Sequence, residues 1–183
     1  KVTKISTDIN YLKNLNKNLI LLYTGVKRTA NDVASTYINK LNKEKSSQMH
    51  DVLQNLEEAK KIIKYKKNPN HFGDLLNKTW MIKRSLSKSV SNEAIDDLYK
   101  SAIKNGALGG KLLGAGGGGF FLFYVPQHKQ KKFIKSFNKF VNIPFKFSFN
   151  GSETIFGPRL NKQYKSDLIK NKFKTKKFKE FKI

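Results

Sequence analysis

The sequence predicts an α+β fold, in which a small mixed or antiparallel sheet is covered by helices. Short apolar runs bounded by turn residues alternate with longer stretches of helical periodicity, which gives the order strand, four helices, strand, helix and hairpin. In addition, eight of the twelve glycines fall between Gly106 and Gly119, directly before an apolar run. That clustering predicts a tight loop that leads into a buried strand.

The first elements are indicated by where the apolar residues fall. Leu19–Tyr23 is a short apolar run ended by Thr24–Gly25, as expected of a buried strand, and residues 2–5 form a weaker strand candidate. Apolar residues then recur at helical spacing. The predicted helices cover 30–41, 49–63, 70–86 and 91–105, the last with Ser91 as N-cap and Gly106 just beyond its end. Trp80, on the third helix, is expected to pack in the core rather than to stack on a substrate.

The elements after the glycine cluster complete the predicted sheet. Residues 120–125 are strongly apolar and are stopped by Pro126. A basic amphipathic helix is predicted next, and its inward residues are expected to be Phe133, Ile134, Phe137 and Val141. Residues 144–149 alternate between apolar and polar, Asn150–Gly151 suits a type I′ turn, and residues 153–156 complete a hairpin.

Composition narrows the function classes. A chain of 183 residues with 38% hydrophobic residues is long enough for one domain with a sizeable core. There is no cysteine, which excludes disulfides and thiolate metal sites, and the three histidines are scattered, so no metal site is expected. No apolar stretch is long enough for a membrane span and no signal peptide is visible, so we expect a cytoplasmic protein without a membrane partner.

The net charge of +24 raises the question of nucleic acid as a partner. Only three of the 37 basic residues are arginine, and the lysines are spread over every segment. Because arginine dominates base readout, a lysine-rich solvated surface is the preferred interpretation and nucleic acid is not expected. A basic tail is predicted at 158–183, after a domain at 1–157. A solvated extension is the ordinary account of this tail, and base stacking or insertion into a membrane surface by its phenylalanines stays open.

The glycine cluster is the predicted site. Each glycine gives up more backbone freedom on folding than any other residue, so a cluster indicates positive φ angles or a close backbone approach to another group. A phosphate held by successive backbone N–H groups is the favoured partner, and a flexible linker is the alternative. We expect a loop between a helix and the strand at 120–125, with at least one positive φ. Its predicted site residues are Gly114, Ala115, Gly116, Gly117, Gly118 and Gly119.

The run from Gly106 to Tyr124 resembles the third motif of the GHMP small-molecule kinases. Residues 22–30, 75–86 and 95–99 are similar to the heptose 7-phosphate kinase branch of that superfamily, and the resemblance covers roughly residues 1–156. It implies the carboxy-terminal domain of these kinases, with a ferredoxin-like sheet. It also implies transfer of the γ-phosphoryl group of ATP, with Mg²⁺, to a hydroxyl of a sugar phosphate.

The Gly/Ser-rich ATP loop of these kinases has no counterpart upstream of residue 25. The resemblance therefore implies a carboxy-terminal half that is incomplete alone. Its partner would be an amino-terminal kinase half, which holds the catalytic residues and most of the ATP and Mg²⁺ sites. No catalytic residue is expected in this chain.

The same resemblance suggests residues for the substrate. A substrate that already carries a phosphate needs cations, and Arg28, a rare arginine directly after a strand, suits that role. The other candidates are Lys111, for which an ordinary surface lysine is the alternative, Gly110 and Thr24. Two other functions stay open, namely another GHMP sugar 1-kinase of the fucokinase type and a non-catalytic basic binding module on the same fold.

Overall fold

The computed structural model describes residues 5–41 and 43–149. The chain divides into two units, residues 1–145 and 146–183. Of the second unit only residues 146–149 are described, and they form neither helix nor strand. Every element below belongs to the first unit. The predicted domain boundary at 157/158, the turn at 150–151, the strand at 153–156, the basic tail and all but the last residue of the strand at 2–5 lie outside the described residues.

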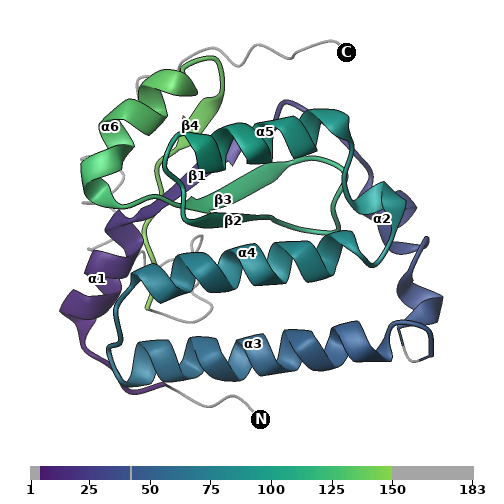
Figure 1. Cartoon of the computed structure of the whole chain (residues 1–183), viewed down its shortest axis with the longest axis horizontal. Helices are drawn as coiled ribbons and strands as arrows, with labels where there is room; N and C mark the ends of the chain where they lie inside the picture. Colours follow the sequence, from purple (N-terminus) through teal and green to yellow (C-terminus); the bar gives the residue numbers. More distant parts are fainter. Residues whose placement is uncertain (1–4, 42, 150–183) are drawn as a thin grey trace, which may run out of the picture. The chain divides into compact units, whose positions relative to one another are not determined.

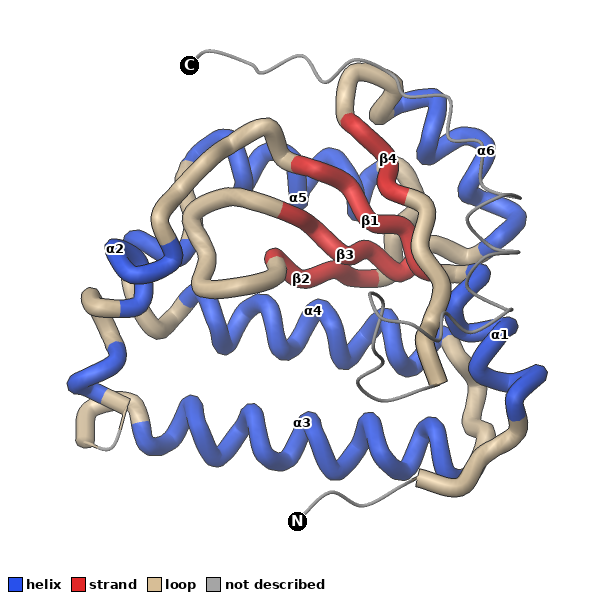
Figure 2. Tube along the Cα trace, turned by 180° about the vertical axis from the view of Figure 1, so that it is seen from behind, coloured by secondary structure: helices blue, strands red, loops and turns tan. Residues whose placement is uncertain are grey.

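A four-stranded antiparallel sheet forms the centre of the first unit, with the strand order β2-β3-β1-β4. β1 (Leu19–Tyr23) and β3 (Phe120–Tyr124) pair in the middle, and β2 (Gly109–Leu112) and β4 (Val141–Ile143) form the edges. Helices connect β1 to β2 and β3 to β4, whereas a hairpin joins β2 to β3 (Figure 2). This is the connectivity of the ferredoxin-like sheet that the resemblance implied, whereas the predicted element order placed the hairpin after the last helix.

Helices lie beside this sheet and against one of its faces (Figure 1). They are α1 (Ile9–Lys17), α2 (Ala30–Ala34), α3 (Ser46–Lys64), α4 (Asn70–Arg84), α5 (Glu93–Lys104) and α6 (Gln127–Ser136), with 3₁₀ turns at Ile38–Lys40 and Lys88–Val90. α5 covers one face of the sheet, α4 runs along its β2 edge, and α3 packs on the far side of α4. The predicted helices at 49–63, 70–86 and 91–105, the basic helix and both predicted central strands are confirmed.

Aromatic side chains fill the layer between α5 and the sheet. The rings of Phe121 and Phe123 stack at 4.4 Å between centroids, and Tyr99 of α5 lies over Phe121 at 5.7 Å. Trp80 of α4 meets Phe121 edge-on at 5.2 Å and is fully buried, which confirms its predicted place in the core. Phe133 of α6 closes the other end of this layer against Phe123. Edge-on and offset aromatic pairs of this kind stabilise beyond their buried area.

Some expectations for regular structure were wrong, and two elements were missed. The helix at 30–41 is two short pieces, because the hydroxyls of Ser35 and Thr36 donate to the carbonyls of Asp32 and Val33 and so compete with helical hydrogen bonding. α1 and β2 were not predicted. The N-cap of α5 is Asn92 rather than Ser91, since the Asn92 side chain accepts from the N–H of Ile95.

The last strand was predicted too late in the chain. Residues 144–149 form no strand; β4 is Val141–Ile143 and pairs with residues 21–23 of β1. Pro144 has no N–H to continue the ladder, so the strand ends before it. Val141 therefore belongs to this strand and not to the basic helix. Ile134, predicted to face inward, is 41% exposed, because α6 is short and only its Phe133–Phe137 row meets the core.

Candidate functional site

The glycine loop, residues 113–119, is the turn of the β2–β3 hairpin. The N–H of Leu113 donates to the carbonyl of Phe120 at 2.8 Å and closes the hairpin. Four glycines have positive φ angles, as predicted: Gly114 (69°), Gly116 (123°), Gly117 (74°) and Gly119 (94°). The expectation that a helix precedes the loop was wrong, since β2 leads into it. The left-handed conformations at these positions suit glycine and few other residues.

Two N–H groups of the glycine loop anchor it to the rest of the domain. Gly117 donates to the carbonyl of Val90 at 2.8 Å, and Gly119 donates to the carbonyl of Val26 at 2.9 Å. The loop also lies tightly on its own chain: a Cβ at Gly116 would come within 2.9 Å of the Val90 backbone, and one at Gly118 would overlap the Val26 carbonyl. At these positions the glycines therefore allow the loop to approach the protein's own backbone closely.

The N–H groups that alternate with these two, those of Gly116 and Gly118, have a different environment. Within the described part of the chain, neither Gly116 nor Gly118 donates its N–H to a protein oxygen. Gly118 also lines a surface cavity. Among residues 114–119 it is therefore the one that both borders a possible ligand site and has an N–H with no described protein acceptor.

The second wall of that cavity follows β1. Thr24 is buried, and both its N–H and its hydroxyl donate to the carbonyl of Gly119, at 2.8 and 2.9 Å. The same hydroxyl accepts from the N–H of Val26 at 3.2 Å. These bonds fix the start of the segment that carries Arg28 against the end of the glycine loop.

The cavity joins parts of the predicted site that lie far apart in the sequence. Its volume is about 620 Å³, within the range of small-molecule sites. The residues that line it are Val26, Lys27, Arg28, Thr29, Asp32, Gly118 and Gly119. The side chains of Lys27, Arg28, Thr29 and Asp32 are exposed, and the stem of Arg28 passes beside Gly117, where an added Cβ would lie 3.1 Å from Arg28 Cγ. The cavity thus combines two cations, one carboxylate and a backbone donor.

The remaining predicted site residues lie elsewhere. Gly110 faces the core, where a Cβ would overlap the ring of Phe123. Lys111 lies in β2 opposite Leu122 and does not line the cavity. Gly114, Ala115, Gly116 and Gly117 belong to the loop but do not line the cavity either. Among the substrate candidates, Arg28 alone lines the cavity, and Thr24 supports its wall.

Lys83 was not predicted as part of the site, although it supports the glycine loop. Its Nζ donates to the carbonyl of Leu112 at 2.9 Å and to that of Gly114 at 2.5 Å. Burial, with a smaller contribution from the nearby Lys111 charge, lowers the pKa of Lys83 to about 8. The signal available in the sequence was a lysine three residues after Trp80, on the same face of a helix that otherwise packs inward.

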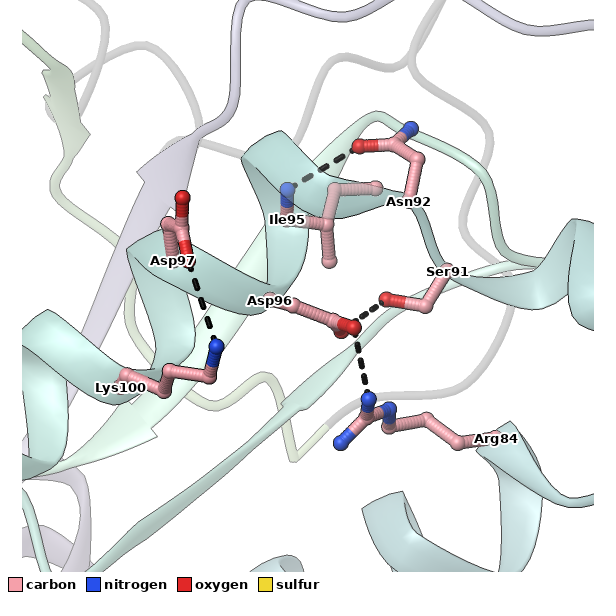
Figure 3. Close-up of polar contacts among 7 residues, drawn as sticks. All are labelled: Arg84, Ser91, Asn92, Ile95, Asp96, Asp97 and Lys100. Carbon is pink, nitrogen blue, oxygen red and sulfur yellow. Dashed lines mark hydrogen bonds and ion pairs between the residues drawn. The ribbon is translucent and has the colours of Figure 1, made fainter.

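A polar network fixes the turn between α4 and α5 behind the loop (Figure 3). Asp96 accepts from Arg84 at 2.7 Å and from the hydroxyl of Ser91 at 2.6 Å. Asn92 has two roles: its Oδ1 caps α5 at Ile95, and its Nδ2 donates to the carbonyl of Gly117 at 3.3 Å. The network therefore reaches the glycine loop through Asn92.

The described residues contain neither a cluster suited to a metal ion nor a helix suited to span a membrane. In residues 5–41 and 43–149, no three side chains of His, Cys, Asp or Glu gather closely enough to hold a metal ion. Over the same residues, none of the helices combines the length and the apolar character that a bilayer crossing needs.

Comparison with known proteins defines the family. The family described as GHMP kinases C terminal matches residues 52–143, about half of the chain, so the chain belongs to the GHMP kinases and carries their carboxy-terminal domain. It is 35% identical over 136 residues to the D-glycero-alpha-D-manno-heptose 7-phosphate kinase of Campylobacter jejuni subsp. jejuni serotype O:2. That alignment covers 74% of this chain and 40% of the relative.

Solved structures agree with this assignment. The chain is similar to a candidate sugar kinase from Campylobacter jejuni, with a TM-score of 0.58, 27% identity, and coverage of 82% of this chain and 42% of that one. It is also similar to the Methanococcus jannaschii mevalonate kinase, with a TM-score of 0.60, 25% identity, and coverage of 78% and 42%. The chain thus spans about two fifths of the length of each of these three relatives.

Proposed function

We propose that this chain forms the acceptor-binding side of an ATP-dependent sugar-phosphate kinase that resembles heptose 7-phosphate kinase. The observation that carries the proposal is the cavity in which Arg28 and Gly118 meet. The 35% identity to a heptose 7-phosphate kinase supports a sugar phosphate as the substrate. The reaction would transfer the γ-phosphoryl group of ATP to a sugar hydroxyl.

Arg28 would bind the phosphate that the sugar already carries. Its planar guanidinium presents several N–H donors and suits bidentate binding of phosphate oxygens. Lys27 adds a second positive charge at the cavity, and Gly118 adds a backbone donor. Because phosphoryl transfer depends on positioning and charge stabilisation, holding the phosphate end would fix the distance of the acceptor hydroxyl from ATP.

ATP supplies the phosphoryl group and Mg²⁺ neutralises its developing charge when they are bound. The described residues include no cluster suited to a metal, so we assign no Mg²⁺ ligand to them. The cavity fits a phosphate group because it has two cations and, at Gly118, an N–H that no described protein oxygen accepts. Catalytic residues and the ATP loop would belong to an amino-terminal kinase half, the proposed partner of this domain.

The test is Arg28→Gln in the full protein that carries this chain. Loss of a charged, bidentate contact of about 1.5–3 kcal/mol is expected to raise the KM for heptose 7-phosphate about 10- to 100-fold. The KM for ATP and the melting temperature are expected to stay unchanged, because the Arg28 side chain is exposed. ADP release in a coupled assay measures both constants.

The matched control for Arg28→Gln is Lys100→Gln. Lys100 is also an exposed cation, but it pairs with Asp97 on α5 and does not line the cavity. An unchanged KM for heptose 7-phosphate in Arg28→Gln, or an equal rise in the control, would contradict the proposed role of the cavity.

A further inference from the structure

Among the described residues, Asp32 is the one acidic side chain that lines the cavity. Asp32 lies in the first turn of α2. Its N–H donates to the carbonyl of Thr29 at 3.2 Å, which holds its backbone close to the segment that carries Arg28. Its carboxylate is exposed and has no hydrogen bond or ion pair within residues 5–41 and 43–149. A carboxylate at the proposed phosphate-binding cavity bears on which ligand the cavity would take.

Asp32 disfavours the binding of a simple anion in this cavity. A negative charge beside Lys27 and Arg28 weakens the attraction of the cavity for any simple anion. However, an ionised carboxylate offers only acceptors, so its natural complement is a hydroxyl donor. A ligand that combines a phosphate with neighbouring hydroxyls satisfies the cations and the carboxylate together.

The size of the cavity agrees with such a ligand. A volume of about 620 Å³ leaves room beyond a single phosphate group. A hydroxy acid such as mevalonate would also offer a hydroxyl, but its carboxylate would meet the like charge of Asp32. Mevalonate kinases share this fold, so the fold by itself does not select between the two acceptor classes.

We infer that Asp32 is a specificity-determining residue that accepts hydrogen bonds from the hydroxyls of a phosphorylated polyol and disfavours acceptors that carry a carboxylate. The inference rests on the proposed function, because it concerns the same cavity. It goes further because it assigns to Asp32 the discrimination between phosphorylated polyols and acceptors that carry a carboxylate.

The test is Asp32→Asn in the full protein that carries this chain, with the affinity for each probe measured by titration calorimetry. The probes are heptose 7-phosphate, inorganic phosphate and mevalonate. Replacing charged by neutral hydrogen bonds is expected to weaken heptose 7-phosphate binding about fivefold. Removing the negative charge is expected to strengthen binding of inorganic phosphate and of mevalonate about twofold. The proposed role predicts that Asp32→Asn lowers the affinity for heptose 7-phosphate and raises the affinity for inorganic phosphate.

Asp97→Asn is the matched control, because Asp97 is an exposed acid on α5 that does not line the cavity. It is expected to leave all three affinities unchanged. Asp32→Asn shifting both phosphates in the same direction, or neither, would overturn the inference. Titration of Arg28→Gln with the same probes tests the proposed function separately. If Arg28→Gln leaves the affinity for inorganic phosphate unchanged, the proposed phosphate site at Arg28 is wrong, independently of the result for Asp32→Asn.

Discussion

The two walls of the cavity are built in different ways. The glycine wall is the glycine loop, of which Gly118 and Gly119 line the cavity. Backbone anchors it, since Gly117 and Gly119 donate to the carbonyls of Val90 and Val26, and Gly118 has no room for a side chain. The facing wall presents exposed side chains, among them Arg28 and Asp32. The difference indicates a division of tasks: substitutions in the glycine wall should change folding, whereas substitutions in the facing wall should change binding.

The largest stability effect is expected from Gly118→Val. A Cβ at this position would overlap the carbonyl of Val26, so the two walls would have to move apart. Overpacking of this kind typically costs about 1–3 kcal/mol, and we expect the upper part of that range. Urea denaturation followed by circular dichroism measures the free energy of unfolding.

Gly114→Ala is the control for Gly118→Val. Unlike Gly118, Gly114 has a positive φ, of +69°, and a Cβ added there would have no atom within 4 Å. It is expected to lose about 1 kcal/mol, from backbone strain alone. If both variants lost the same amount, the contact between Gly118 and Val26 would not be what requires a glycine there.

Asn92 tests how the glycine wall is attached to the helices. Asn92→Ala removes the α5 cap and the hydrogen bond to the Gly117 carbonyl, so a loss of about 1–2 kcal/mol in unfolding free energy is expected. Asn92→Asp keeps a good cap but removes the donor to Gly117. It should lose less stability than Asn92→Ala, while hydrogen exchange at Gly117 should accelerate in both. Slow exchange at Gly117 in Asn92→Asp would show that the loop does not depend on this contact.

The sequence was most informative where local pattern and burial agree. The apolar run at 19–23 and the helices from 46 onward follow side-chain periodicity, which directly reports the buried face. The positive φ angles of the loop followed from glycine density. The resemblance to the GHMP kinases, confirmed by the family match over residues 52–143, extended this to the ferredoxin-like sheet.

Tertiary contacts explain most of what the sequence did not reveal. β2 begins with two glycines, which have low strand propensity, and they are needed because Gly109 lies on the α4 backbone at Gly73 and Gly110 lies on the Phe123 ring. In the site, Arg28 was predicted from its rarity and position. Asp32 and Lys27 were not predicted, because their place at the cavity depends on how the segment after β1 turns toward the glycine loop.

The smallest expected effect concerns the base of the glycine wall and its dependence on pH. The pKa of Lys83 is about 8 in the folded chain, against an ordinary value of 10.5, so between these values the unfolded chain binds more protons at this position. Its contribution to stability should therefore rise as the pH increases from about 8 to 10.5, and it should be constant below that window. Comparing the chain with Lys83→Met isolates this group, because the raised pKa values of Tyr99 and Tyr124, about 12 each, affect both proteins alike.

The measurement for Lys83 is the difference in unfolding free energy between the two proteins from pH 6 to pH 10. That difference should shift in favour of the native chain above about pH 8, where a neutral amine still donates to the carbonyls of Leu112 and Gly114 without the cost of burying a charge. Lys111→Gln should move the onset to higher pH, since the Lys111 charge contributes to lowering the pKa of Lys83. A difference that stays constant over the whole range would mean that the Lys83 amine remains solvated and that its burial does not lower its pKa.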